Sequence, residues 1–325
     1  MARYRSALPQ LGGGLFLTDG GIETTLIFHE GLELPDFAAF HLLQDSKGKA
    51  ALRKYFRTYA GIAKRLGVGL VLESATWRAN PDWATRLGYT RETLAQANQK
   101  AIRLLEEIRS ELAQEKIDVV ISGCLGPRGD GYSPANTMSD RDAEAYHRDQ
   151  VETFAGTAAD MVTAITMNYV EEATGIARAA QRAGMPVAIS FTVETDGRLP
   201  TGQTLRAAIE QVDAATSAYP AYYMINCAHP THFDQVLAED EAWTHRIRGL
   251  RANASRKSHA ELNEAPELDI GDPAELAVQH AAMVRRLPQL SVLGGCCGTD
   301  HRHVEQIAVA CFPLVQTATH PAARI

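Results

Sequence analysis

Eight short apolar segments, separated by stretches with helix signals, are the feature that most constrains the fold of this 325-residue chain. They cover residues 15–19, 69–74, 118–123, 161–166, 186–192, 222–227, 246–252 and 290–295. Runs such as "VVIS" and "VAISF" are continuous, as expected for strands that helices cover on one side and core side chains on the other. Eight strand–helix units predict an α/β fold, a single TIM (β/α)8 barrel over residues 1–325.

Helix boundaries are marked in the stretches between these segments. Thr90 and Ser139 are predicted N-caps, the second forming a capping box with Asp142, and Gly67 and Gly184 are predicted helix stops. We find no low-complexity linker, composition break or repeat that would mark a second domain. One barrel domain is therefore expected.

Composition limits the partners of the chain. The net charge of −7 and the pI of 5.9 argue against nucleic acid or an anionic membrane as the partner and favour a small molecule. No run of about 18 uncharged apolar residues predicts a membrane span, and the start "MARYRSALPQLGGG" does not resemble a signal peptide. We expect a cytoplasmic protein, compatible with a homo-oligomer, whose five cysteines are thiols or metal ligands rather than a disulfide framework.

Polar residues and cysteines close several of the predicted strands. Asp19 ends the first, Glu73 the second, Asn226 and Cys227 the sixth, and the pair Cys296–Cys297 follows the eighth. In TIM barrels the reactive groups lie at the carboxyl ends of the strands. We therefore expect these side chains to converge on one rim of the barrel.

Three of these residues are candidate zinc ligands. Zinc prefers thiolate and imidazole ligands, and a catalytic site keeps three protein ligands with an open fourth position. Cys227, Cys296 and Cys297 would supply three thiolates, and the glycines around the adjacent pair permit the turn that brings both sulfurs to one metal. The alternative is that these cysteines are small apolar core residues.

A site of three thiolates indicates a particular chemistry. It carries net negative charge with zinc, which suits holding a substrate thiol as thiolate better than activating water. The reaction expected from the residues is alkyl transfer to sulfur, with a small-molecule thiol and an alkyl donor as partners. Two other classes remain open: a redox protein that uses Cys296–Cys297 as a dithiol, and a zinc-binding barrel without turnover.

The motifs "INC" at 225–227 and "GGCCGT" at 294–299 resemble those of the zinc-dependent homocysteine S-methyltransferases, the family of the betaine- and S-methylmethionine-using enzymes. The resemblance covers nearly the whole chain, with weaker matches at 18–26, 190–205 and 252–255. It implies zinc as cofactor, Cys227, Cys296 and Cys297 as its ligands, and methyl transfer from a sulfonium or betaine-type donor to homocysteine. Asp19 matches the acidic residue that contacts the amino group of the substrate.

Two departures from the family concern the thiol acceptor. The family places a Glu-Thr pair at the end of strand four to hold the homocysteine ammonium, and here Ile165 and Thr166 stand there. Glu73 is a candidate replacement from a neighbouring strand, although it could instead pair with an arginine. Arg78 stands where the family has a smaller polar or tyrosine residue and could hold a carboxylate. The alternative acceptor is therefore a carboxylate-bearing thiol without the α-amine.

The remaining candidates have simpler explanations. His229 and His232 could be ligands, but a capping or solvent-facing role is favoured. Cys124 and Cys311 are expected to pack as small apolar residues. A basic cluster is expected to be a solvated face, with an anion site as the alternative; it comprises Arg246, Arg248, Arg251, Arg256 and Lys257. Three aromatic residues could form a cation–π cage for the methyl donor or simply pack: Trp77, Trp83 and Tyr89.

Overall fold

The protein is a closed barrel of eight parallel strands that are paired in sequence order. The computed structural model describes residues 1–238, 240–265 and 267–319. The strands are β1 Phe16–Leu17, β2 Gly69–Glu73, β3 Val119–Leu125, β4 Met161–Met167, β5 Val187–Phe191, β6 Tyr222–Asn226, β7 Ile247–Ala252 and β8 Val292–Gly295. Pairing of β1 with both β2 and β8 closes the barrel. All eight predicted strands and the TIM barrel are confirmed.

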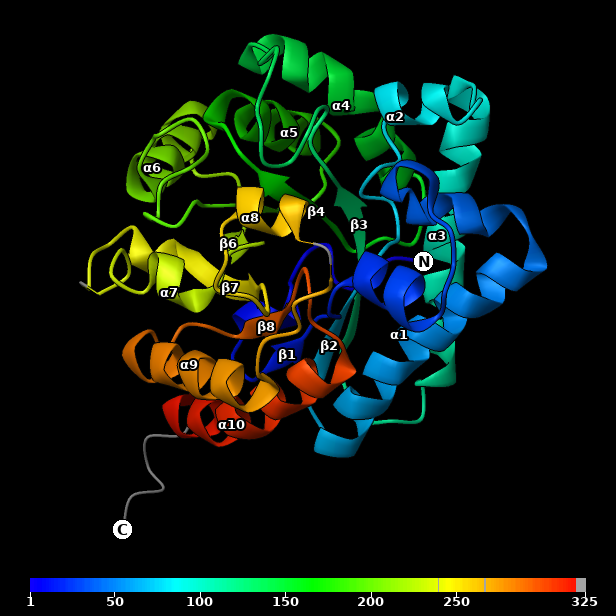
Figure 1. Cartoon of the computed structure of the whole chain (residues 1–325). Coiled ribbons are helices and arrows are strands. Elements are labelled where there is room, and N and C mark those ends of the chain that lie inside the picture. Colours follow the sequence, from blue (N-terminus) through cyan, green and yellow to red (C-terminus); the bar gives the residue numbers. More distant parts are fainter. Residues whose placement is uncertain (239, 266, 320–325) are drawn as a thin grey trace.

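Helices surround the strands, as Figure 1 shows in a view onto one end of the barrel. The α-helices are α1 Ser46–Leu66, α2 Pro81–Arg86, α3 Arg91–Glu111, α4 Asp140–Ala155, α5 Val170–Arg182, α6 Leu205–Thr216, α7 Pro230–Phe233, α8 His259–Glu264, α9 Pro273–Arg286 and α10 His301–Thr319. Short 3-10 or π turns are η1 Pro9–Leu11, η2 Thr24–His29, η3 Pro35–Phe37, η4 Ala39–Gln44 and η5 Thr244–Arg246. Among the described residues, no helix has the length and apolar character that crossing a membrane requires.

The predicted helix boundaries match the structure. Thr90 caps α3 and Ser139 caps α4, each side chain accepting a hydrogen bond from a backbone N–H of the first turn. Gly67 ends α1 in the left-handed conformation, which glycine adopts without a steric penalty. Gly184 follows α5 with a φ of 63°. These local signals explain why the helices begin and end where they do.

The interior of the barrel has an apolar floor. Residues of the inward faces form a buried cluster at this level, namely Leu8, Phe16, Val71, Val120, Met161, Ala188, Tyr222, Met224 and Val292. Gly69 makes room for the Phe16 ring, because a Cβ at this position would lie 2.3 Å from it. The barrel is therefore filled below the level at which the polar residues begin.

Beyond this apolar floor, the next inward-pointing positions along β2 and β7 carry polar side chains. Successive side chains of a strand point to opposite faces, so the residue two places after an inward one also points inward. Val71 is followed in this way by Glu73, and Gly249 by Arg251, whose outward neighbours belong to the outer apolar core. Arg251 is only 5% exposed, so the prediction of a solvated face is wrong for this residue.

Candidate active site

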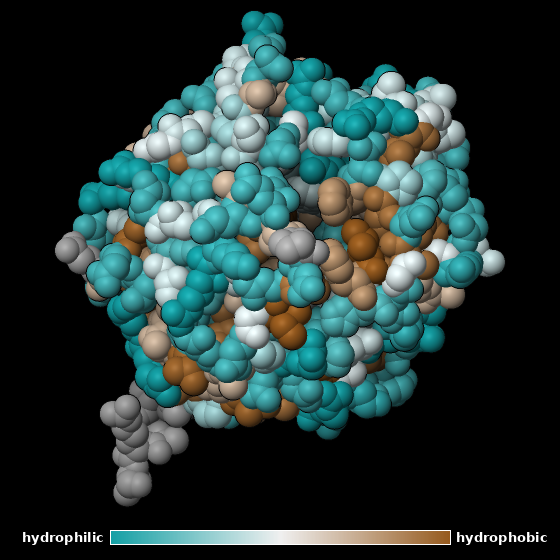
Figure 2. Space-filling view, in the orientation of Figure 1, coloured by the Kyte–Doolittle hydropathy of each residue, from teal (hydrophilic) through white to brown (hydrophobic). Residues whose placement is uncertain are grey.

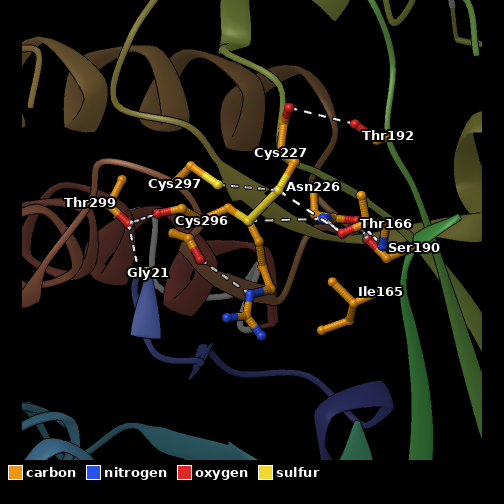
Figure 3. The surroundings of a disulfide bond; sticks show 12 residues. Gly21, Ile165, Thr166, Ser190, Thr192, Asn226, Cys227, Cys296, Cys297 and Thr299 are labelled. Carbon is orange, nitrogen blue, oxygen red and sulfur yellow. Dashed lines mark hydrogen bonds between the residues drawn. A yellow bond between two sulfur atoms is a disulfide. The ribbon is translucent and has the colours of Figure 1, made fainter. Parts of the chain in front are cut away.

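Three cysteine sulfurs meet at the carboxyl ends of β6 and β8, and all three lie within 4.8 Å of one another. The chain leaves β6 at Cys227, which has a φ of 52°, and leaves β8 before Cys296–Cys297. The predicted convergence is confirmed. Cys227 and Cys296 are joined as a disulfide with 2.50 Å between the sulfurs, and Cys297 Sγ lies 3.8 Å from Cys227 Sγ (Figure 3).

This disulfide differs from the expectation that all five cysteines are thiols or metal ligands. Its physical reason is the convergence itself, since two strand ends bring the sulfurs of Cys227 and Cys296 into bonding range. Cys124, Cys297 and Cys311 are free thiols. The pairing also differs from the dithiol alternative, in which Cys296 and Cys297 would have paired with each other.

A hydrogen-bond network behind the sulfurs fixes the end of β6. Asn226 Oδ1 accepts hydrogen bonds from the Thr166 backbone N–H at 2.9 Å and from Ser190 Oγ at 2.6 Å. Asn226 Nδ2 donates to Thr166 Oγ1 at 2.9 Å, and Thr166 is held at a φ of 66° (Figure 3). Of the two predicted residues, Thr166 lines the cavity in front of the sulfurs, whereas Asn226 supports it from behind.

Tyr132 contacts the sulfurs from the loop after β3. Its hydroxyl donates to Cys227 Sγ at 3.2 Å and lies 3.5 Å from Cys297 Sγ. Burial, with the neighbouring Cys297, raises the pKa of Tyr132 well above its ordinary value, so the hydroxyl keeps its proton. The Tyr132 ring packs against His259, whose Nε2 lies 2.5 Å from the Cys227 carbonyl oxygen. Both residues lie in loop or short-helix segments that carried no sequence signal for this contact.

A cavity of about 380 Å³ opens in front of the three sulfurs. It is lined by the predicted residues Asp19, Glu73, Arg78 and Thr166 and also by Ile165, which presents carbon alone (Figure 3). Figure 2 shows apolar surface along the rim of a hollow on this face. Two exposed aromatic residues, Phe28 and Phe37, line the cavity. The site is therefore a pocket with an apolar mouth and a charged, sulfur-rich interior.

Asp19 already has partners inside the protein. Arg251 Nη2 donates to Asp19 Oδ1 at 2.5 Å, and the Tyr55 hydroxyl donates to Asp19 Oδ2 at 2.7 Å. Burial alone would lower the pKa of Arg251, but the carboxylates of Asp19 and Glu73 outweigh it and raise that pKa above its ordinary value. Arg251 is thus a permanent buried cation at the side of the cavity.

Two carboxyl groups of the cavity have strongly raised pKa values. Burial raises the pKa of Glu73 to about 7, although Arg251 and nearby hydroxyls oppose the shift. Burial also raises the pKa of Glu23 to about 7, with a smaller contribution from the charge of Asp19. Glu23 lies in the motif at residues 18–26, where nothing in its local sequence pattern distinguishes a cavity residue from a residue at a helix start.

Two of the candidate cage residues, Trp77 and Trp83, stack against the guanidinium of Arg78. The guanidinium of Arg78 lies 4.1 Å from the Trp77 ring centroid and 3.9 Å from that of Trp83. Its Nη1 donates to the Gly129 carbonyl oxygen at 3.0 Å. Tyr89 instead lies within hydrogen-bond distance of His41 and Gln44. These three aromatics therefore do not form the open cage that was considered for the methyl donor.

The remaining sequence candidates lie outside the sulfur group. His229 caps α7 through its side chain, which is one of the roles favoured for it, and His232 Nε2 lies 2.9 Å from the Arg256 carbonyl oxygen. Cys124 is buried in the cavity wall, and Cys311 is buried in the apolar core. Of the other basic residues of the cluster, Arg246, Arg256 and Lys257 form ion pairs, and Arg248 Nη1 donates to the Gln289 carbonyl oxygen at 3.5 Å.

Comparisons with known proteins agree with this geometry. Residues 16–311 match the profile of the family described as homocysteine S-methyltransferase. The homocysteine methyltransferase MmuM from Escherichia coli has a similar structure in its oxidized form, with a TM-score of 0.70 and 20% identity over 91% of this chain and 95% of that one. Its metallated form gives a TM-score of 0.70 at 18% identity, over 91% and 96% of the chains. These structural similarities support the same barrel fold.

Proposed function

The chain belongs to the homocysteine S-methyltransferase family, and from this premise we propose that Cys227, Cys296 and Cys297 hold zinc and that the methyl donor is a sulfonium or betaine-type compound. The enzyme is a thiol S-methyltransferase, and homocysteine is the acceptor that the family match supports. The observation that carries the proposed site is the meeting of three sulfurs within 4.8 Å in the lining of one cavity.

The sulfurs suit the metal. In a tetrahedral zinc–thiolate site the sulfurs lie about 3.8 Å apart, because each Zn–S bond is about 2.3 Å long. Cys227 Sγ and Cys297 Sγ are separated by 3.8 Å, and reduction of the disulfide would free the sulfurs of both Cys227 and Cys296 to join Cys297 as ligands. Bound zinc would supply deprotonation of a substrate thiol, which leaves its sulfur nucleophilic. We place the enzyme in the cytoplasm, where thiols are kept reduced.

Residues of the chain itself orient this site and form its wall. The Tyr132 hydroxyl donates to a sulfur and so stabilises negative charge on it. The bonds of Asn226 to Thr166 fix the turn that carries Cys227. The segment after β7, including Leu262, forms part of the cavity wall.

A second acceptor class is favoured by one observation. Asp19 is already paired with Arg251 and Tyr55, and Ile165 offers no charge, so the family's ammonium contacts are incomplete. A carboxylate-bearing thiol without an α-amine, held by Arg78, would avoid this loss. We favour homocysteine because the family match includes both Asp19 and the sulfur site.

Mass spectrometry of the products tests the proposal. Reduced, zinc-loaded protein would be incubated with homocysteine and one donor at a time. The donors are S-methylmethionine, dimethylsulfoniopropionate and betaine. We expect methionine with at least one donor and none from the Cys297→Ala variant. Cys311→Ala is the matched control, because this cysteine lies in the apolar core outside the site. Zinc binding without methylation of any thiol would instead support the non-catalytic barrel.

A further inference from the structure

Three buried charged side chains of the cavity each have one atom without a hydrogen-bond partner, namely Glu73 Oε2, Arg251 Nη1 and Arg78 Nε. The guanidinium of Arg78 lies against the Trp77 and Trp83 rings. Glu73 and Arg251 are 4% and 5% exposed, and both line the cavity in front of the sulfurs. Buried polar atoms are nearly always paired, so an unpaired carboxylate oxygen and an unpaired guanidinium nitrogen in one cavity indicate a ligand with both a cation and an anion.

The other atoms of these groups are already used. Arg251 donates through Nη2 to Asp19 Oδ1 at 2.5 Å and through Nε to the Gly295 carbonyl oxygen at 3.2 Å. The hydroxyls of Ser122 and Thr163 interact with the Glu73 carboxyl group. Each side chain is therefore held in place by the protein, and Glu73 Oε2 and Arg251 Nη1 remain for a ligand.

The positions of the two residues fit a ligand that reaches the sulfurs. Arg251 on β7 pairs with Asn226 on β6 and with Gly294 on β8, the strands that lead directly to Cys227 and Cys296–Cys297. Glu73 stands at the end of β2, on the other side of β1 and β8 in the closed sheet. A small molecule between them would have its charged end bound and its thiol directed to the cysteines.

We propose, on the basis of the proposed function, that Glu73 Oε2 accepts a hydrogen bond from the α-ammonium of homocysteine and that Arg251 Nη1 donates to its α-carboxylate. Arg251 thereby has two roles, since it also neutralises Asp19. Ile165 packs against the methylene carbons instead of binding charge. The chain thus replaces the family's acidic contact at position 165 with a contact from β2, and it adds a carboxylate contact from β7.

The proposed contacts of Glu73 and Arg251 with the amino-acid end of homocysteine are called the clamp. Three thiols that differ by one charged group test this clamp in the wild-type protein. They are L-homocysteine, 4-mercaptobutyrate, which lacks the amine, and 3-aminopropane-1-thiol, which lacks the carboxylate. The Michaelis constant of each is measured with one fixed donor in the wild type, Glu73→Gln and Arg251→Lys. Glu144→Gln and Arg109→Lys are matched controls, because these buried residues form ion pairs outside the cavity.

The clamp predicts a crossed pattern. Glu73→Gln should raise the Michaelis constant about 10- to 100-fold for the two amine-bearing thiols and leave that of 4-mercaptobutyrate nearly unchanged. Arg251→Lys should raise it similarly for the two carboxylate-bearing thiols and leave that of 3-aminopropane-1-thiol nearly unchanged. Equal effects on all three thiols, or none, would overturn the assignment.

Binding of L-methionine to the metal-free protein separates the clamp from the chemistry. Calorimetry should show a dissociation constant for L-methionine that is about 10- to 100-fold larger in Glu73→Gln than in the wild type. If no thiol is methylated, the proposed function fails, and this binding experiment still decides about the clamp. If Arg251→Lys does not fold, the Michaelis constants of the three thiols in Glu73→Gln decide. In the wild type, a Michaelis constant for 4-mercaptobutyrate equal to that for homocysteine would contradict the clamp.

Discussion

At the scale of single residues, Arg251 interacts with two carboxyl groups of the cavity. It neutralises Asp19 by direct contact and acts on Glu73 electrostatically. Losing one partner of a buried pair costs about 3–5 kcal/mol, because the other charge stays buried and uncompensated. The electrostatics of the cavity are therefore described better by this group of three charges than by Asp19 alone.

Glu73 should make stability depend on pH. Its pKa is about 7 in the folded protein, raised from 4.5 by burial. A raised carboxyl pKa gives a stabilising contribution that is complete below about pH 4.5 and is lost as the pH rises through 7. Relative to Glu73→Gln, we expect the free energy of unfolding of the wild type to fall by about 3 kcal/mol between these limits.

Urea unfolding of both proteins across this pH range measures the difference. Glu23 titrates in the same window but is present in both proteins, so its contribution cancels. Parallel pH profiles of the two proteins would show that Glu73 is not buried as a carboxylic acid.

At the level of elements, the turn after β8 positions two of the three sulfurs. Gly294 packs against β1 so closely that a Cβ would lie 1.9 Å from Thr18 Oγ1 and 2.8 Å from the Asp19 carbonyl oxygen. The sequence indicated a glycine-permitted turn, and the structure adds close packing between β8 and the end of β1. The turn and the residue Asp19 are therefore coupled through direct contact.

Gly294→Ala should disturb this turn. Overpacking of this kind costs about 1–3 kcal/mol, and the shift should also move Cys296 and weaken metal binding. Thermal unfolding and zinc affinity measure the two effects. Gly61→Ala is the control, because a Cβ there meets only Arg65 Nη1 at 3.8 Å. Unchanged zinc affinity in Gly294→Ala would show that the cysteines do not depend on this contact.

At the level of the whole molecule, the barrel and its sulfur site could be predicted from the sequence because both follow from repeating patterns. Eight apolar segments predict eight strands, and strand ends in a closed parallel barrel meet at one rim. Tyr132 and His259 could not be predicted, because they reach the sulfurs from irregular segments whose course depends on the complete fold. Arg251 could have been placed inside the barrel, since it alternates with the outward Leu250 and Ala252.

The fold should persist without metal. A barrel of this size has an extensive apolar core around and inside the sheet, so it does not depend on a metal as a small zinc domain does. Treatment of the reduced protein with a chelator should leave the far-ultraviolet circular dichroism unchanged while removing methyl transfer. Wholesale loss of the helical signal would contradict this expectation.

The most direct test of the three-cysteine site is the zinc content of the purified, reduced protein and of its Cys297→Ala variant, measured by inductively coupled plasma mass spectrometry. We predict one zinc per chain in the wild type and almost none in the variant, because two thiolates lose both the geometry and the charge of the site. Full zinc occupancy in Cys297→Ala would contradict the assignment of Cys227, Cys296 and Cys297 as the metal ligands.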